Sequence, residues 1–489
     1  MRAPSTIHRP LATIAVAALA IAACKVGPDY ARPATSVPAQ FRDGPDTTEP
    51  LSIADRPWWE VFDDPTLGGL IDQAIADNND LRVAVARIEQ ARGLQMQIVS
   101  PLFPQIGYGG AVSRGRNEFL ETPVPNGGQT KSSGVVALTA FWEIDLWGRI
   151  RRADEAALAN ILATEEARRA VLLSVVSETA QLYFVLLGLD LQLEIARQNA
   201  ASFAETRRIF ELRSRGGLDS DLAVSRASAA EQTVRAAIPL LERDIAIAEN
   251  ALNVILGRAP QPIARPRGLA EQSDPPSVPV GIPSQLLERR PDIRVREQEM
   301  IAANATVGVA IANYFPQLSL TAALGRVSPE LSAFSAGTSN LWSIGAGLAG
   351  PIFQGGRLQG AERSARAAFE ESVASYRQSV IVALKDVSDA LVSREKLDLA
   401  EGDQAAAVGS LDRSVDVSTR RFLSGLASYF EVLEAQQLRF PAEQSLASTR
   451  TQKRLALVQL YRALGGGWNL SEEEWRRPTA PATAAAPTS

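Results

Sequence analysis

The amino-acid sequence predicts an α+β membrane protein in which one unit occurs twice, each copy being a β-hairpin followed by a long coiled-coil helical hairpin. Three observations lead to this prediction. They are an internal duplication, two long proline-free stretches with a helical period, and short alternating segments ahead of each stretch. An ordinary globular helical bundle fits less well, because the predicted helices are much longer than those of a typical globular domain.

The duplication appears as a constant offset between matching segments. Phe103-Pro104-Gln105 returns as Phe315-Pro316-Gln317, which is 212 residues later. From Gly148 and its counterpart Gly356 onward, the offset is 208. Residues were therefore gained or lost only in the first part of the unit, where a polar connection at 116–133 is expected to be an external loop. The unchanged offset beyond it predicts helical elements of equal length in the two copies.

The first 23 residues have the pattern of a bacterial lipoprotein signal peptide. A positively charged start is followed by the apolar run Leu11–Ala22 and then by Cys24, the only cysteine in the chain. This run is too short to span a bilayer, which takes about 20 residues. We expect residues 1–23 to be removed and Cys24 to carry lipid, and Lys25 favours sorting to the outer membrane. An ordinary signal peptide with an incidental cysteine is the alternative.

The composition offers few groups for catalysis. The single histidine, His8, lies in the predicted signal peptide, so the mature chain has no imidazole and no disulfide. Most hydrolytic, redox and zinc chemistry is therefore not expected, and neither is an enzyme, a metal or a cofactor other than the lipid. A net charge of −5 makes nucleic acid an improbable partner. We also expect no membrane-spanning helix, so any insertion would use strands.

Residues 126–238 and 352–440 contain no proline and form the predicted hairpins, with tips near 216 and 425. Apolar residues in the first stretch step by alternating threes and fours, which is typical of a coiled coil. They are Leu172, Val175, Thr179, Leu182, Leu186, Leu189, Leu193, Ala196, Ala200 and Phe203. A helix over residues 152–213 would rise roughly 90 Å. The pattern is weaker in the second copy, where Arg394 and Glu401 match Leu186 and Leu193.

Four segments that precede the hairpins alternate apolar with small or polar residues, as transmembrane β-strands of about 9–11 residues do. They lie at about 104–115, 134–143, 316–327 and 340–350. Four strands cannot close a membrane barrel, because the smallest closed barrels have eight. Two chains would give eight strands and a filled interior, whereas three would give twelve and leave a pore. We therefore expect a homotrimer.

The predicted organisation follows from these boundaries. Its parts are a signal peptide at 1–23, a lipidated segment at 24–60, repeat 1 at 61–258, a linker at 259–275, repeat 2 at 276–467 and a C-terminal segment at 468–489. Each repeat opens with a helix ahead of its strands. The tail from Pro478, rich in Ala, Pro and Thr, is expected to be disordered.

Several motifs along the chain resemble one family. They are Cys24-Lys25-Val26-Gly27-Pro28-Asp29-Tyr30, Trp58-Trp59, Asp145-Leu146-Trp147-Gly148-Arg149, Arg290-Pro291-Asp292-Ile293-Arg294 and Tyr429-Phe430-Glu431. In this order they resemble the TolC-like outer-membrane factors, in the lipoprotein branch that serves RND-type multidrug efflux pumps. The resemblance covers nearly all of the mature chain. It implies a trimeric 12-stranded β-barrel on a periplasmic α-helical barrel, which passively exports drugs or other small molecules. Its partners would be a periplasmic adaptor (membrane fusion protein) and an inner-membrane transporter.

The resemblance also implies a gate where the helical hairpins converge in the periplasm. Glu431 and Glu434 lie one turn apart after the second tip, and Arg226 occupies the position equivalent to Glu434 in the first copy. We interpret the two glutamates as lumen-facing and Arg226 as their counter-charge. A solvated helix face is the alternative reading of these residues.

The turns themselves would contact the adaptor. The candidate residues are Arg213, Gly216, Gly217 and Leu218 in the first copy and Arg421, Gly425 and Leu426 in the second. A helix C-cap role is the alternative for the basic residues, and N-capping accounts for Asp219 and Asp221.

Two other readings of the whole chain are weaker. A structural coiled-coil or adaptor lipoprotein without a pore would leave the four strands unexplained. A dinucleotide fingerprint at Gly345-Ala346-Gly347-Leu348-Ala349-Gly350 is followed by a helix of about 60 residues, whereas a cofactor site needs a short one.

Overall fold

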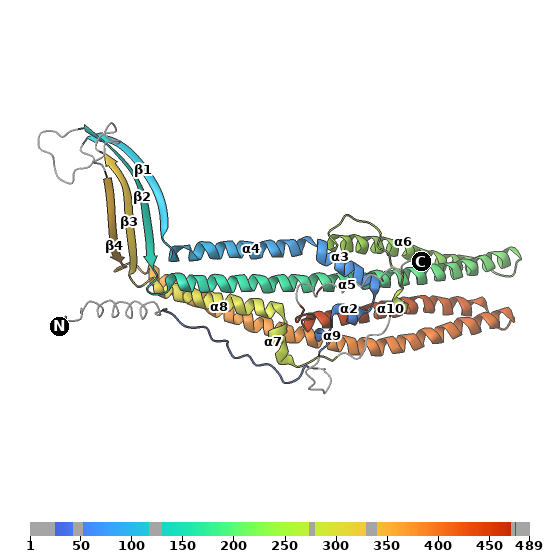
Figure 1. Ribbon diagram of the computed structural model, residues 1–489. Coiled ribbons are helices and arrows are strands. Elements are labelled where there is room, and N and C mark those ends of the chain that lie inside the picture. The colour runs from blue at the N-terminus through green and yellow to red at the C-terminus, as the bar shows by residue number, and fades with distance from the viewer. Residues whose placement is uncertain are drawn as a thin grey trace, which may run out of the picture. The chain divides into compact units, whose positions relative to one another are not determined.

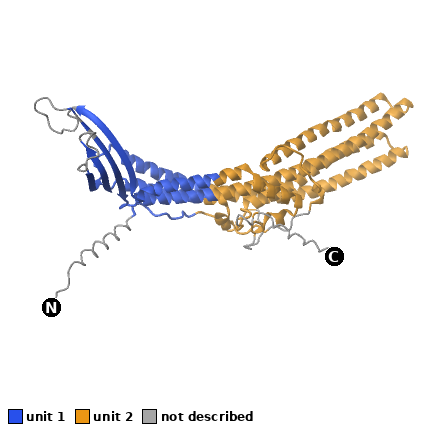
Figure 2. Ribbon diagram, turned by 45° about the horizontal axis from the view of Figure 1, so that its top comes forward, with its two compact units in different colours: residues 1–34, 86–165, 295–377 blue, residues 35–85, 166–294, 378–489 orange. Residues whose placement is uncertain are grey.

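The computed structural model describes residues 25–42, 52–116, 130–272, 279–328, 340–470 and 475. The chain forms two compact units, coloured separately in Figure 2. Unit 1 contains residues 1–34, 86–165 and 295–377, and unit 2 contains residues 35–85, 166–294 and 378–489. Both repeats contribute to each unit, so the repeat boundaries describe the duplication and not the compact units. Cys24 and the tail from Pro478 lie outside the described residues.

Unit 1 contains one antiparallel sheet whose order follows the chain, β1-β2-β3-β4 (Figure 1). Its strands are β1 (Gln105–Arg116), β2 (Thr130–Ile144), β3 (Gln317–Ser328) and β4 (Asn340–Ala349). β2 pairs with β3, which joins the hairpin of one repeat to that of the other. The predicted loop at 116–133 is too long, because the ladder continues through polar residues as far as the pair Arg116 and Thr130.

The sheet has one apolar face and one face of small or polar residues, which confirms the alternation predicted from sequence. Tyr108, Leu138, Leu324 and Trp342 are successive register partners across the four strands, so they lie on the same face. A neighbouring row on the opposite face is Gly107, Thr139, Ala323 and Ser343. The apolar face is open, since the side chain of Tyr108 is 89% exposed.

The helices keep equal lengths in the two copies, as the constant offset predicts. α5 (Arg149–Arg215) and α9 (Arg357–Leu423) each have 67 residues. α6 (Asp221–Ile255) and α10 (Tyr429–Ala463) each have 35 and continue through an internal proline. The remaining helices are α2 (Trp58–Phe62), α3 (Pro65–Asp77), α4 (Asn79–Val99), α7 (Leu286–Arg289) and α8 (Pro291–Ala312).

One face of α5 is buried along the predicted coiled-coil positions, including Leu172, Leu186 and Phe203. This confirms the helical period. The expectation that no helix could cross a membrane needs one correction, because α5 contains an 18-residue window that passes the length and composition test. Since 61% of that window is buried inside the protein, it resembles a core helix.

The core of unit 2 forms around the N-terminal helices. Asp64 caps α3 by accepting hydrogen bonds from the backbone of Thr66 and Leu67. Its second oxygen accepts a 2.9 Å hydrogen bond from the hydroxyl of Tyr183 on α5. Phe62 of α2 packs edge-on against Tyr461 of α10, at 5.9 Å between ring centres. These contacts hold α2 and α3 against the long helices.

Candidate functional site: the two helical tips

Each helical hairpin of unit 2 turns at a short tip. Tip 1, residues 216–220, joins α5 to α6, and tip 2, residues 424–428, joins α9 to α10. In tip 1 the Leu218 amide donates to the Arg213 carbonyl at 2.8 Å, and the Gly217 amide donates to the Ser214 carbonyl at 2.9 Å. This is a Schellman cap, in which the residue after the helix takes the left-handed conformation that glycine adopts without a steric penalty.

Tip 2 repeats the same backbone. The Leu426 amide donates to the Arg421 carbonyl at 2.9 Å, and Gly425 has a φ of +72°, the value that Gly217 has in tip 1. Arg213 and Arg421 therefore complete the C-caps with their carbonyls, while their side chains remain available for other contacts.

Both tips present a leucine to solvent. Leu218 is 69% exposed and Leu426 is 73% exposed. A Schellman cap usually buries the apolar residue at this position against the end of its own helix. Here both leucines are largely exposed, so each tip presents an apolar group next to a basic residue.

The side chains around tip 1 are mainly charged. Arg213 forms an ion pair with Asp219 and lies 5.2 Å from the ring centre of Phe422. Asp221 accepts a 3.3 Å hydrogen bond from the Ser214 hydroxyl. Neither aspartate is the N-cap residue of α6, because Ser220 takes that position and its side chain makes no cap hydrogen bond. Asp221 lies in the first turn of α6, where a negative charge complements the helix dipole. Asp219 instead forms its ion pair with Arg213 on the other side of the turn.

The side chains around tip 2 are mainly aromatic. The Tyr429 ring packs edge-on against Phe210 at 4.7 Å and against Phe422 at 4.6 Å. Its hydroxyl lies 2.8 Å from the Thr206 hydroxyl, which also donates to Gln436 at 3.2 Å. Burial raises the pKa of the Tyr429 phenol. Because Phe210 and Thr206 belong to α5 of the first hairpin, this cluster joins the two hairpins within one chain.

A buried acidic group lies deeper in the first hairpin. Glu231 of α6 is 1% exposed and accepts a 2.5 Å hydrogen bond from Arg207 of α5. Arg235 donates to the other carboxylate oxygen at 3.2 Å. The hydrogen bond from Arg207, together with the nearby positive charges, lowers the pKa of Glu231 despite its burial. Glu231 therefore links α5 to α6 as a carboxylate.

Two of the gate candidates share a helix face. Glu431 and Glu434 are exposed on α10, while Val432, Leu433 and Ala435 between and beside them are buried. Glu431 lies 3.5 Å from Arg421, one of the adaptor candidates.

The predicted pairing of Arg226 with Glu434 is not present within the described part of this chain. The Arg226 guanidinium instead lies over the Phe430 ring, 5.7 Å from its centre. Arg226 and Phe430 border a groove of about 450 Å³ between α6 and α10. Phe203, Val234, Leu433 and Phe440 also line it.

Sequence reasoning missed the aromatic cluster and Glu231. In the sequence, Tyr429 is the first residue of a motif that the family shares, and Phe210 and Phe422 have no counterpart of the same type in the other copy. The signal that could have found them is this break in the duplication. Residues that differ between otherwise matched copies are candidates for contacts between them.

Comparison with known proteins agrees with this architecture. The family described as outer membrane efflux protein matches residues 70–258 and 282–466. The two matched segments begin 212 residues apart and end 208 apart, which are the offsets of the duplication. The family unit therefore corresponds to one copy of the repeat, and the match covers most of the chain.

Individual relatives cover nearly the full length. The solvent efflux pump outer membrane protein SrpC of Pseudomonas putida is 33% identical over 93% of this chain and 98% of its own. The probable outer membrane lipoprotein SilC of Salmonella typhimurium is 32% identical over 92% of this chain and 96% of its own. The solved outer-membrane channel OprN superposes with a TM-score of 0.85 at 29% identity, covering 91% of this chain and 100% of that structure. The chain belongs to the outer membrane efflux protein family and is an outer-membrane efflux channel that extends into the periplasm, not an enzyme.

Proposed function

We propose that three copies of this chain form a 12-stranded β-barrel continuous with a periplasmic α-helical barrel, and that the assembly passively exports drugs or other small molecules. The four-stranded sheet with its open apolar face is the observation that carries this proposal. Strands β1 and β4 are the two edges of that sheet. In lipid their unpaired backbone groups would each cost several kcal/mol, so the edges need partner strands. Identical copies supply them by closing a ring.

The composition of the two faces of the sheet also supports an assignment of one face to lipid and the other to the lumen. The apolar row through Tyr108 and Trp342 suits acyl chains, and the row of glycine, threonine, alanine and serine suits a lumen. Small lumenal side chains would leave the pore wide. The alternatives without a pore, a structural coiled-coil lipoprotein or an adaptor, give this sheet no role.

The tips would receive a periplasmic adaptor that couples the channel to an inner-membrane RND-type transporter. Exposed Leu218 and Leu426 beside Arg213 and Arg421 offer an apolar contact with a charged rim, which is the usual composition of a protein interface. Gly216, Gly217 and Gly425 keep the turns narrow enough for a partner to approach the backbone. Lipid on Cys24 would anchor each copy to the outer membrane.

Glu431, Glu434 and Arg226 remain our gate candidates, with altered contacts. Three copies would place rings of acidic groups near the tips, and such rings favour cations and can hold a constriction. Within one chain the closing contacts would be the Glu431–Arg421 pair and the Tyr429 cluster. Arg226 would act through the Phe430 ring or through a neighbouring copy.

Conductance of the purified protein in a planar bilayer tests the channel. We expect a small conductance for the wild type that increases in Glu431→Gln and Glu434→Gln. Glu242→Gln is a matched control, because it removes the same charge from an exposed pair with Arg197 away from the tips. Purified protein that stays non-conducting in every variant and with adaptor present would refute the pore. An equal increase in the control would refute the gate alone.

Substitution at tip 2 tests the adaptor contact. Gly425→Asp should leave the trimer and its membrane level unchanged and abolish efflux. The site has open space and aspartate tolerates positive φ better than most residues, so folding is expected to survive. Gly402→Asp, inside α9 and also with open space, should export normally. Normal drug resistance with Gly425→Asp would rule out docking at this turn.

A further inference from the structure

Two arginines occupy equivalent positions on the first strand of each repeat. Arg114 of β1 and Arg326 of β3 are 212 residues apart, which is the offset of the duplication at the start of these strands. Both side chains are exposed. Since successive side chains alternate between the two faces of a sheet, Arg114 lies on the same face as Tyr108 and Arg326 on the same face as Leu324. Both arginines therefore belong to the apolar face.

Each arginine follows a run of uncharged residues on that face. The run in β1 is Ile106, Tyr108, Gly110 and Val112, and the run in β3 is Leu318, Leu320, Ala322 and Leu324. From the first residue of each run to its arginine the strand rises roughly 27 Å. The apolar band of a membrane barrel is about 25 Å tall. Both arginines therefore lie near the end of such a band.

The register of the sheet is consistent with a common height for the two arginines. Arg326 shares its row with Val136 and Gly110, four residues before Arg114 in β1. A shift of this kind between equivalent positions is the stagger that the tilted strands of a closed barrel need. In a ring of equivalent units, positions related by the duplication have the same height although they occupy different rows of the register.

The charge on the apolar face has one sign. Among the side chains that the structure describes in the four strands, the charged ones are Arg114, Arg326 and Glu143. Glu143 lies on the opposite face, at the helix end of the sheet, where β2 and β4 lead to α5 and α9. It pairs with Arg149 at 2.7 Å. The apolar face thus combines a neutral band with a positive outer end, which is the end at which β1 and β3 finish.

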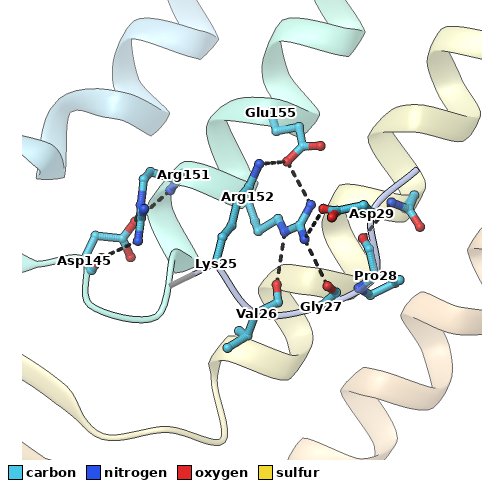
Figure 3. Close-up of polar contacts among 10 residues, drawn as sticks. Lys25, Val26, Gly27, Pro28, Asp29, Asp145, Arg151, Arg152 and Glu155 are labelled. Carbon is cyan, nitrogen blue, oxygen red and sulfur yellow. Dashed lines mark hydrogen bonds and ion pairs between the residues drawn. The ribbon is translucent and has the colours of Figure 1, made fainter. Parts of the chain in front are cut away.

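Arginines near the helix end of the sheet have acidic partners within the chain. Arg151 pairs with Asp145 at 3.2 Å (Figure 3). The side chain of Arg152 is 1% exposed, and its guanidinium donates to the carboxylate of Asp29 and to the carbonyl of Val26, both at 3.0 Å. These arginines are part of the fold. The two strand arginines are instead presented to the surroundings on an exposed sheet face.

The outer end of the sheet lies at the outer surface of the membrane. The helices of this channel extend into the periplasm, and they join the strands at the helix end. Arginines on the lipid side at the outer end therefore meet the head groups of the outer leaflet. In an outer membrane this leaflet is rich in phosphorylated glycolipid. A guanidinium is well suited to such a ligand, because it can donate two parallel hydrogen bonds to one phosphate.

We propose that Arg114 and Arg326 form a phosphate-binding ring around the outer end of the barrel, and that the ligand of this ring is the phosphorylated glycolipid of the outer leaflet. The inference rests on the proposed three-copy barrel with its apolar face toward lipid. It goes beyond export, because it assigns a lipid ligand to this surface. The phosphates of neighbouring glycolipids repel each other, and a cation fixed on the wall neutralises them where the lipid meets the protein.

Lipid binding to the purified full-length protein tests the ring. Titration in detergent, followed by native mass spectrometry, compares the affinity for bis-phosphorylated lipid A with that for the same lipid after both phosphates are removed. We expect a preference of at least ~10-fold for the phosphorylated lipid, and this preference should decrease as the salt concentration rises. Equal affinities in the wild type would overturn the proposal before any variant is made.

A double variant, Arg114→Gln with Arg326→Gln, should lose the preference and keep the affinity for the dephosphorylated lipid. Arg357→Gln is the matched control, because it removes the same charge from an exposed arginine at the helix end, where Arg357 donates to Gln354 at 2.8 Å. The control should keep the full preference. A preference that survives in the double variant, or that disappears in the control as well, would refute the assignment.

Phosphatidylglycerol separates the two sources of lipid phosphate. It carries one phosphate where lipid A carries two, so we expect it to bind several-fold more weakly. Equal affinities for the two lipids would overturn the glycolipid as the ligand. Conductance in neutral phosphatidylcholine bilayers is measured on the same preparations, and the double variant should conduct like the wild type. The pore proposal fails on conductance and the ring fails on lipid preference, so the two failures are distinguishable.

Discussion

Tips 1 and 2 share a backbone, an arginine and an exposed leucine, but the side chains that pack around them differ. Both have the same Schellman hydrogen bonds, and Gly217 and Gly425 have the same φ of +72°. Around tip 1 the contacts are ion pairs such as Arg213 with Asp219, and around tip 2 they are rings centred on Tyr429. The duplication thus retained the geometry of the turn and changed the chemistry that supports it.

We expect the ring contacts around tip 2 to resist separation more strongly than the ion pairs around tip 1. Buried rings lose contacts when they separate, and this loss does not depend on salt. Exposed ion pairs are weak and are screened by salt. A gate needs a closed state that is stable and an element that can be displaced. The two tips supply these two properties separately.

The largest expected effect is from Tyr429→Ala. Removing a buried aromatic ring typically costs about 3–5 kcal/mol, and here the loss falls on contacts to both hairpins. Amide hydrogen exchange at the start of α10 should accelerate by about two orders of magnitude, while the start of α6 changes little. Tyr429→Phe, which removes the hydroxyl near Thr206 and keeps the ring, should cost only about 1 kcal/mol. Equal exchange at both tips would contradict the comparison.

Alanine at the two turn glycines should have a smaller and equal effect. At Gly217 and Gly425 a Cβ would meet no atom within 4 Å, so the cost is backbone strain alone. We expect about 1–2 kcal/mol at each tip, measured by exchange of the amides that follow. A clear inequality would show that the backbones are not equivalent. Gly402→Ala, inside α9 with ordinary helical geometry, should stabilise slightly.

Acidification should destabilise the first hairpin through protonation of Glu231. The hydrogen bond from Arg207 lowers the pKa of Glu231 below its ordinary value of 4.5. The ionised carboxylate therefore contributes fully to the stability of the hairpin above pH 4.5. That contribution is lost as the pH falls from 4.5 through the lower folded-state pKa. We expect several-fold weaker exchange protection of the first hairpin at pH 3.5, absent in Glu231→Gln. The second copy has Arg439 at the equivalent position, so this particular contact is absent there.

The smallest expected effect is from the exposed pair at tip 2. Arg421 and Glu431 are about half exposed and 3.5 Å apart, so Arg421→Gln should change local exchange by no more than a few-fold. Raising the salt concentration should change the local exchange rate of the wild type by a similar factor and leave that of the variant unchanged. A loss comparable to that of Tyr429→Ala would show that the charges, and not the rings, hold the hairpins.

Local patterns in the sequence determined the elements. Alternation over about ten residues predicted the strands, and steps of three and four predicted the buried face of α5, because each reflects the repeat of a single element. The predicted start of β2 is too late in the sequence, because the polar residues at the beginning of the strand do not alternate with apolar ones. The constant offset of 208 determined that the helices have equal length in the two copies.

The tertiary structure alone decided which residues meet across the repeats. Thr206 and Tyr429 are 223 residues apart, and Asn304 and Pro28 are 276 apart. Periodicity reports the face of a helix that is buried, but it does not report the partner on the other side. For this reason the family resemblance indicated gate residues near the tips, while the ring cluster at tip 2 and the seat of Arg152 became visible only once the chain was folded.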